Sequence, residues 1–199
     1  MNVISIEAQK RNELGQKSAK ELRRSEVVPC VLYGGDDVVH FSAPSKSFKS
    51  VVYTPDFNVV ELSIDGATFK CVLKDIQFHP VTDKILHIDF MQLVDDKKVV
   101  VELPLEFNGL AEGVKAGGKL LPQLRKLRVK ALPKDLKPVL PVDVTELQLG
   151  KSVKVRELNF DGLEIMNSGG SPIVSIEIPR SLRSKQSAEE GEEEVAAEA

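Results

Sequence analysis

DIQFHPVTDKILHIDF, residues 75–90, is the stretch of sequence that decides how this chain folds and what it presents to other molecules. Side chains alternate between the two faces of an extended strand, so His87 and Asp89 share one face while Ile88 and Phe90 share the other. One face of this strand is polar and can form hydrogen bonds, and the other is apolar and suited to a core. The pattern predicts a strand in the wall of a β-structure that offers a recognition surface.

The composition is that of an ordinary globular protein. The 199 residues are enough for one large domain or two small ones, with 42% hydrophobic and 29% charged residues. No apolar run approaches the roughly 18 residues of a membrane-spanning helix, and residues 1–15 lack the pattern of a secretory signal. We therefore expect a cytoplasmic protein without a membrane partner.

Cys30 and Cys71 have apolar neighbours and no CxxC spacing, which predicts buried free thiols.

The first half of the chain alternates apolar and polar residues in short runs, which predicts a small β-barrel or sandwich. Asp65-Gly66 is typical of a tight two-residue hairpin. Ser18, with Glu21 three residues later, predicts a short helix that begins with a capping box, and a second short helix, capped at Ser45, is expected to run to Tyr53. The expected strands are 3–9, 27–34, 38–43, 58–64, 67–78 and 84–93.

A polar break at residues 95–98 predicts a boundary between a first domain, 1–95, and a second, mostly-β domain, 96–183. Glycines crowd GLAEGVKAGGKL (109–120), and tight turns between strands explain them better than a phosphate-binding loop. Residues 184–199 contain six Glu and no aromatic side chain, which predicts a disordered acidic tail. The fold class is therefore mainly β with a few short helices (α+β). In the second domain, strands are expected at 99–107, 124–131, 139–144, 163–166 and 172–178, and within 145–155.

No catalytic motif marks the chain as an enzyme. The patterns GxSxG, HExxH, GxxxxGK[ST] and GxGxxG are all missing from the sequence. His79, His87 and Asp89 are residue types that bind zinc or iron, but no further residue completes a ligand set. We expect no enzymatic activity, no cofactor and no bound metal.

Residues 10–24 form the most basic segment, with six Lys or Arg against two Glu. Such a run is equally typical of a solvated helix face and of a contact with RNA phosphates. Tyr33, at the end of the following strand, would add an aromatic ring and a hydroxyl group, and Asp89 could accept a hydrogen bond from a guanine amino group or a 2′-hydroxyl. Residue types and spacing alone leave RNA recognition as one option among several.

Several separate motifs resemble one family. GQKSAKELRR (15–24), VVPCVLYGG (27–35) and residues 75–90 are similar to the bacterial large-subunit ribosomal protein that binds 5S rRNA, in its long, two-domain form, the general stress protein Ctc family. VELPLEFNGLAEGVKAGGKL (101–120), LPVDVTELQLGKSVKV (140–155) and the Glu-rich end resemble the second domain of that form. The resemblance covers nearly the whole chain.

This resemblance implies a structural constituent of the large ribosomal subunit, with an N-terminal barrel of about six strands docked on the loop E region of 5S rRNA. It implies a cytoplasmic protein on the ribosome, with neighbouring ribosomal proteins as further partners and a monomer when free. The alternative is a stress-related protein–protein interaction module of two β domains that binds no RNA. The implied central contacts are Arg11, Arg24, Tyr33, His87 and Asp89, the supporting ones are Lys17, Ser18, Arg23 and Gln77, and His79 is a weaker candidate.

The chain departs from the family pattern at two positions. Glu26 stands where the family usually has glycine, two residues after the paired arginines. Phe78 stands where the family often has arginine, before the His-Pro pair, which removes one phosphate contact. Neither position is among the five central contacts.

Overall fold

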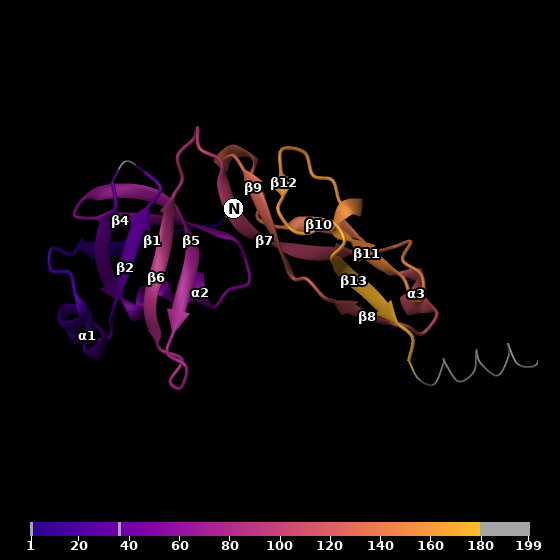
Figure 1. Cartoon of the computed structure of the whole chain (residues 1–199), viewed down its shortest axis with the longest axis horizontal. Coiled ribbons are helices and arrows are strands. Elements are labelled where there is room, and N and C mark those ends of the chain that lie inside the picture. The colour runs from indigo at the N-terminus through magenta and orange to yellow at the C-terminus, as the bar shows by residue number, and fades with distance from the viewer. Residues whose placement is uncertain (1, 36, 180–199) are drawn as a thin grey trace, which may run out of the picture. The chain divides into compact units, whose positions relative to one another are not determined.

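The computed structural model describes residues 2–35 and 37–179, which form two compact units (Figure 1). The first unit holds residues up to 104 together with 129–139 and 162–164, and the second holds 105–128, 140–161 and the residues from 165 on. The predicted boundary after residue 95 stays a prediction. The predicted acidic tail, 184–199, lies outside the described residues. No helix in the described part of the chain is long and apolar enough to cross a membrane.

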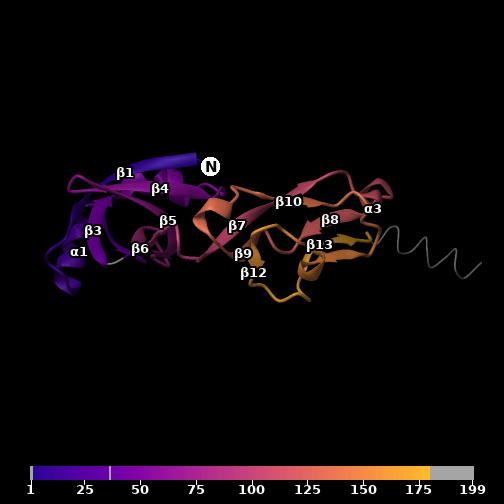
Figure 2. The ribbon, with the colours of Figure 1, turned by 90° about the horizontal axis from the view of Figure 1, so that it is seen from above.

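Six strands close a barrel in the order β1-β3-β2-β6-β5-β4, which confirms the predicted mainly-β fold with an N-terminal barrel. β1 pairs with β4 in parallel, and the two strands run side by side in Figure 2. β2 pairs with β6 in parallel, whereas the other neighbours are antiparallel. The strands are β1 Asn2–Lys10, β2 Val27–Tyr33, β3 Val39–Pro44, β4 Asn58–Ile64, β5 Ala67–Phe78 and β6 Ile85–Gln92.

Alternation along the strands builds the barrel core. Three phenylalanines are fully buried: Phe41 of β3, Phe90 of β6, and Phe48, which follows β3. The centre of the Phe90 ring lies 5.8 Å from that of Phe41 and 6.0 Å from that of Phe48. Tilted aromatic pairs at these distances stabilise a core beyond the area that they bury. Cys30 and Cys71 are also fully buried, as predicted, and burial raises the pKa of both thiols.

The predicted hairpin at Asp65-Gly66 is confirmed. Both residues have positive φ, 48° and 89°, as a two-residue type I′ turn requires, and β4 and β5 pair up to Ile64 and Ala67 on either side of the turn.

The predicted helix caps are wrong. α1 (Gln16–Arg24) begins after Gly15, and Ser18 lies inside its first turn rather than at its start. The Ser18 hydroxyl instead donates to the carbonyl oxygen of Glu13, because the chain before the helix folds back on it. The predicted helix from Ser45 is a 3-10 turn, η1 (Ser45–Phe48), followed by the short α2 (Lys49–Val52), and neither has a side-chain cap.

The remaining strands form two small sheets, ordered β10-β7-β9-β12 and β11-β13-β8. β8 and β13 pair antiparallel, as both views show (Figures 1 and 2). Sequence patterns missed α3, which lies inside the glycine-rich segment 109–120, and β8, which begins at the end of that segment. The elements are β7 Val99–Asn108, α3 Glu112–Lys115, β8 Lys119–Pro122, β9 Lys126–Ala131, η2 Pro133–Asp135, β10 Leu140–Asp143, β11 Ser152–Lys154, η3 Val155–Glu157, β12 Glu164–Ile165 and β13 Pro172–Glu177.

Candidate nucleic-acid interface

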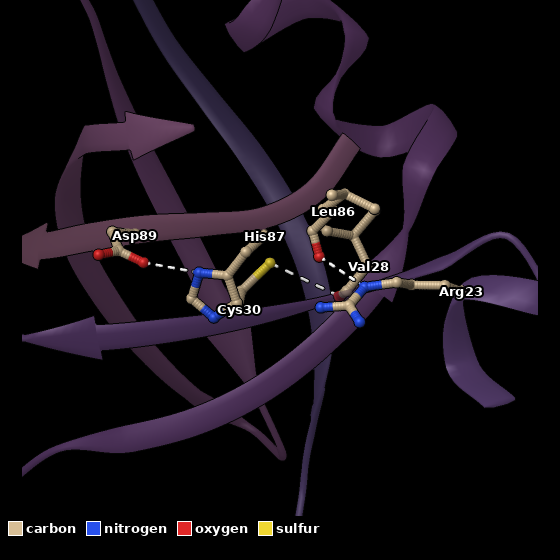
Figure 3. A network of polar contacts seen from close by, with 6 residues as sticks. All are labelled: Arg23, Val28, Cys30, Leu86, His87 and Asp89. Carbon is tan, nitrogen blue, oxygen red and sulfur yellow. Dashed lines mark hydrogen bonds and ion pairs between the residues drawn. The ribbon is translucent and has the colours of Figure 1, made fainter. Parts of the chain in front are cut away.

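His87 and Asp89 form a hydrogen-bonded pair on the outer face of β6 (Figure 3). Ile88 and Phe90 are fully buried, so the residues that alternate with them point outward. The His87 Nδ1 and Asp89 Oδ1 atoms are 2.7 Å apart, and the two side chains keep 24% and 33% of their surface exposed. Since Nδ1–H donates to the carboxylate, a neutral His87 ring presents Nε2 as an acceptor.

β5 places two more polar residues directly across from this pair. Gln77 pairs with His87 and Asp75 pairs with Asp89 in the antiparallel ladder. Opposite residues of such a ladder have neighbouring side chains on the same face. The structure therefore brings Gln77, His87 and Asp89 together, as the resemblance implies.

Asp75 is an addition that sequence reasoning did not select. Asp75 meets Asp89 in the register that also pairs Gln77 with His87, and the register shifts only beyond Asp75, where Lys74 is an extra residue in a bulge. The available signal was the two-residue spacing between Asp75 and Gln77, which puts both side chains on one face of a strand.

Tyr33 lies at the end of β2, the strand next to β6 on its other side. Burial raises the pKa of its half-buried hydroxyl, and the negative charges of Asp89 and Asp75 raise it further. The raised pKa keeps the Tyr33 hydroxyl group a neutral donor at physiological pH. We call the outer surface formed by Tyr33, Asp75, Gln77, His87 and Asp89 the recognition face.

Arg11 is held by β3, by the segment before α1 and by α1 itself. Its backbone N–H donates to the carbonyl oxygen of His40 at 2.9 Å, and its Nη2 donates to the carbonyl oxygen of Glu13 at 3.2 Å and to the Ser18 hydroxyl at 3.5 Å. Burial is the largest influence on the pKa of the Cys30 thiol and raises it; the Asp89 charge also raises this pKa, while the Arg11 charge lowers it. Ser18 thus contacts Arg11 directly and orients its guanidinium.

Arg23 connects α1 to the recognition face. Its Nε donates to the carbonyl oxygen of Leu86 at 2.9 Å (Figure 3). Gln77 pairs with His87 whereas Phe78 pairs with Ile85, so Leu86 is left over in a second bulge of the ladder. The bulge frees the carbonyl group that Arg23 uses, and it fixes the helix next to His87.

The other predicted residues are spread around this core. Lys17 and Arg24 are exposed, and their side chains form no hydrogen bond or ion pair with the residues that the structure describes. His79 is half-buried, and its Nδ1 accepts backbone N–H groups of Val81 and Thr82, each at 3.3 Å. Across residues 2–35 and 37–179, no three His, Cys, Asp or Glu side chains gather as a metal site would require.

Two family models together match nearly all of the described chain. Residues 6–90 match the ribosomal L25p family, and residues 98–180 match the C-terminal domain of ribosomal protein TL5. The large ribosomal subunit protein bL25 of Phocaeicola vulgatus is 48% identical over 190 residues, which cover 92% of this chain and 96% of that protein. The bL25 proteins of Porphyromonas gingivalis and Cytophaga hutchinsonii are 44% and 40% identical, over 92% and 94% of this chain and 96% and 98% of their own lengths.

Proposed function

Because the chain belongs to the ribosomal L25p family, in the long form with a TL5-type second domain, we propose that it binds 5S rRNA through the recognition face of its barrel. Membership makes it a non-enzymatic, structural component of the large ribosomal subunit, and therefore a protein of the cytoplasm, where ribosomes work. Within 5S rRNA, the proposed target is the minor groove of the loop E region.

The recognition face carries the groups that an RNA minor groove needs opposite it. A wide, shallow minor groove displays 2′-hydroxyls and base edges, including the guanine amino group. The free oxygen of Asp89 can accept from that amino group, and Nε2 of His87 can accept from a 2′-hydroxyl. The Tyr33 hydroxyl and the Gln77 amide supply donors. Since Asp89 holds the His87 ring in place, these groups are oriented before RNA arrives.

Positive charge beside the face offsets its carboxylates. Asp75 and Asp89 alone would repel phosphates, but Arg11 is anchored by Glu13 and Ser18, and Arg23 is anchored by Leu86. Phosphate contacts of this kind fix register, while contacts with base edges and hydroxyl groups give selectivity. The single observation that carries the proposal is the outward-facing His87–Asp89 pair in a chain of this family.

A gel shift with 5S rRNA over a range of salt concentrations tests the proposal. Lys17→Ala should weaken binding modestly and make the plot of log affinity against log salt shallower by roughly 1. Asp89→Ala should weaken binding more and leave the slope unchanged, because it removes no phosphate contact. Lys126→Ala, an exposed lysine of β9, is the control and should change neither quantity.

Two results would contradict the proposal. One is a wild-type protein that does not bind 5S rRNA at low salt, where phosphate contacts are strongest. The other is equal, purely salt-dependent losses for Lys17→Ala and Asp89→Ala, which would indicate a non-specific basic patch. Association with ribosomes that survives substitution of Arg24, Tyr33 and His87 would instead favour binding through protein contacts.

A further inference from the structure

A hollow of about 550 Å³ lies on the first unit, bordered by α1, the η1–α2 turn and the residues that join β5 to β6. Its volume is within the roughly 300–1,000 Å³ of pockets that hold small ligands. We call it the basic groove because of the cations that line it, which are Lys20, Arg23, Arg24, Lys46, Lys49 and Lys84.

The charge of the basic groove is unbalanced. Six cations line it against one carboxylate, that of Glu26. None of the six forms an ion pair with a carboxylate among the described residues, and the Nε of Arg23 donates to a backbone oxygen instead. Like charges gathered without partners repel each other, so an anion that binds here relieves this repulsion.

The cations come from three parts of the chain that are distant in sequence. Lys20, Arg23 and Arg24 belong to α1, Lys46 and Lys49 to the η1–α2 turn, and Lys84 to the residues before β6. A solvated face of one helix would carry charge from that helix alone. Here the barrel assembles positive charge around a concave surface, as an anion-binding site requires.

Apolar side chains and one histidine lie among the charges. Val28 and Ile85 are 2% and 6% exposed and form part of the lining. Apolar surroundings strengthen the attraction between a cation and a phosphate because they exclude water. His79 also lines the groove, and because its Nδ1 accepts two backbone N–H groups, a neutral ring carries its proton on Nε2, as a donor.

The chemistry of the lining selects the ligand. Ammonium and guanidinium groups donate hydrogen bonds and accept none, so they suit phosphate oxygens and cannot accept hydrogen bonds from base edges. We propose that the basic groove binds the sugar–phosphate backbone of RNA, without reading its sequence, as a second contact area beside the recognition face. The proposal rests on the proposed function, because rRNA is the polyanion that the recognition face would hold.

Arg23 marks the junction of the two areas. Its side chain lines the groove while its Nε is bonded to Leu86, the residue before His87. A strand of RNA that runs off the recognition face past Leu86 meets the groove cations next. The recognition face then selects the site, and the groove adds affinity that depends on salt.

The test compares two triple variants of the full chain in 5S rRNA binding at several salt concentrations. Replacement of Lys46, Lys49 and Lys84 by Gln should make the slope of log affinity against log salt shallower by about 2–3, since each phosphate contact contributes about 0.7–0.9. The control replaces three exposed lysines outside the barrel by Gln, with the same loss of charge, and should leave the slope unchanged. These control positions are Lys119, Lys126 and Lys151.

Glu26→Gln makes the basic groove more positive, whereas the triple variant makes it less so. It removes the single carboxylate of the groove and keeps the size and polarity of the side chain, so RNA binding should become tighter and the slope steeper. Weaker or unchanged binding by this variant would overturn the inference.

A second probe needs no RNA. Titration with inorganic pyrophosphate should shift the backbone amide resonances of residues 45–49 and 84–86 in the wild type, and not in the groove triple variant. Shifts of equal size around the control lysines would overturn the inference. So would groove shifts combined with an unchanged RNA slope, which would mean that the groove binds another anion.

A wild type that binds no 5S rRNA refutes the proposed function. A wild type that binds 5S rRNA, while the two triple variants behave alike, refutes only the proposal for the basic groove.

Discussion

Glu26 provides a direct test of the local structure that joins α1 to the barrel. The residue has φ of 59°, in the left-handed region that glycine prefers, and it follows the last turn of α1. Its N–H donates to the carbonyl oxygen of Arg23 at 3.3 Å, and its own carbonyl oxygen accepts from Ser45 at 2.9 Å. This is the position of the C′ glycine that ends many helices. We therefore predict that Glu26→Gly stabilises the barrel.

The size of the effect follows from two opposing terms. A left-handed conformation costs a non-glycine residue about 1–2 kcal/mol. Glycine avoids that cost, but it loses about 0.4–1 kcal/mol more chain entropy on folding. The expected gain in the free energy of unfolding is therefore about 0.5–1 kcal/mol, the difference between these two terms. Glu26→Ala is the matched variant, since it removes the carboxylate and keeps the backbone strain.

Urea unfolding followed by tyrosine fluorescence measures this effect in the correct part of the protein. The chain has two tyrosines, Tyr33 and Tyr53, and no tryptophan, and both tyrosines lie in the first compact unit. The Gly variant should unfold at a higher urea concentration than the Ala variant with an unchanged m-value. Equal midpoints for the two variants, or a lower midpoint for Gly, would refute the strain argument.

Three further predictions concern packing and pH. Phe90→Ala should cost about 3–5 kcal/mol of barrel stability in urea, since it empties a fully buried aromatic site. Gly113→Ala should lower the free energy of unfolding by about 1–3 kcal/mol, because a Cβ there would lie 2.7 Å from a backbone nitrogen. Gly170→Ala is the control, since a Cβ at that position meets nothing within 4 Å. The Thr145 hydroxyl and backbone N–H donate to Asp143 and hold the pKa of that carboxyl below its usual value. These hydrogen bonds stabilise the folded protein above pH ~4, and this stabilisation is lost as the pH falls through the lowered pKa of Asp143. Acid should therefore destabilise Thr145→Val less steeply than the wild type. Urea unfolding curves recorded at a series of pH values measure the difference.

Local patterns predicted the strands well because each depends on a few neighbouring residues. Alternation located β4 and β5, and Asp65-Gly66 located their turn with the correct two-residue length. The closure of the barrel by a parallel pair of β1 and β4 was out of reach, since strand pairing depends on residues far apart in sequence. The error at Ser18 has a similar cause, because contacts with Arg11 and Glu13 outweigh the local capping pattern.

The candidate site, like the fold, could be predicted from the sequence only in part. His87 and Asp89 share a face because of a two-residue spacing that can be read from the sequence. Asp75 joins them because it pairs with Asp89 in the same register that pairs Gln77 with His87, and the pairing of β5 with β6 cannot be read from either strand alone. The basic groove was also invisible in the sequence, since Lys46 and Lys84 become neighbours of α1 only when the barrel closes.

The bulge at Leu86 explains how one strand serves two kinds of contact. A regular ladder would bond the Leu86 carbonyl to β5, and Arg23 would then have no acceptor there. With the bulge, the side chain of Arg23 bonds to the backbone of the residue before His87, which ties α1 to this part of β6. In the proposed complex, this bond would keep the contacts that position RNA in register with those that select it. Under the proposed function, β6 (Ile85–Gln92) would connect the phosphate contacts of α1 with the base and sugar contacts of His87 and Asp89.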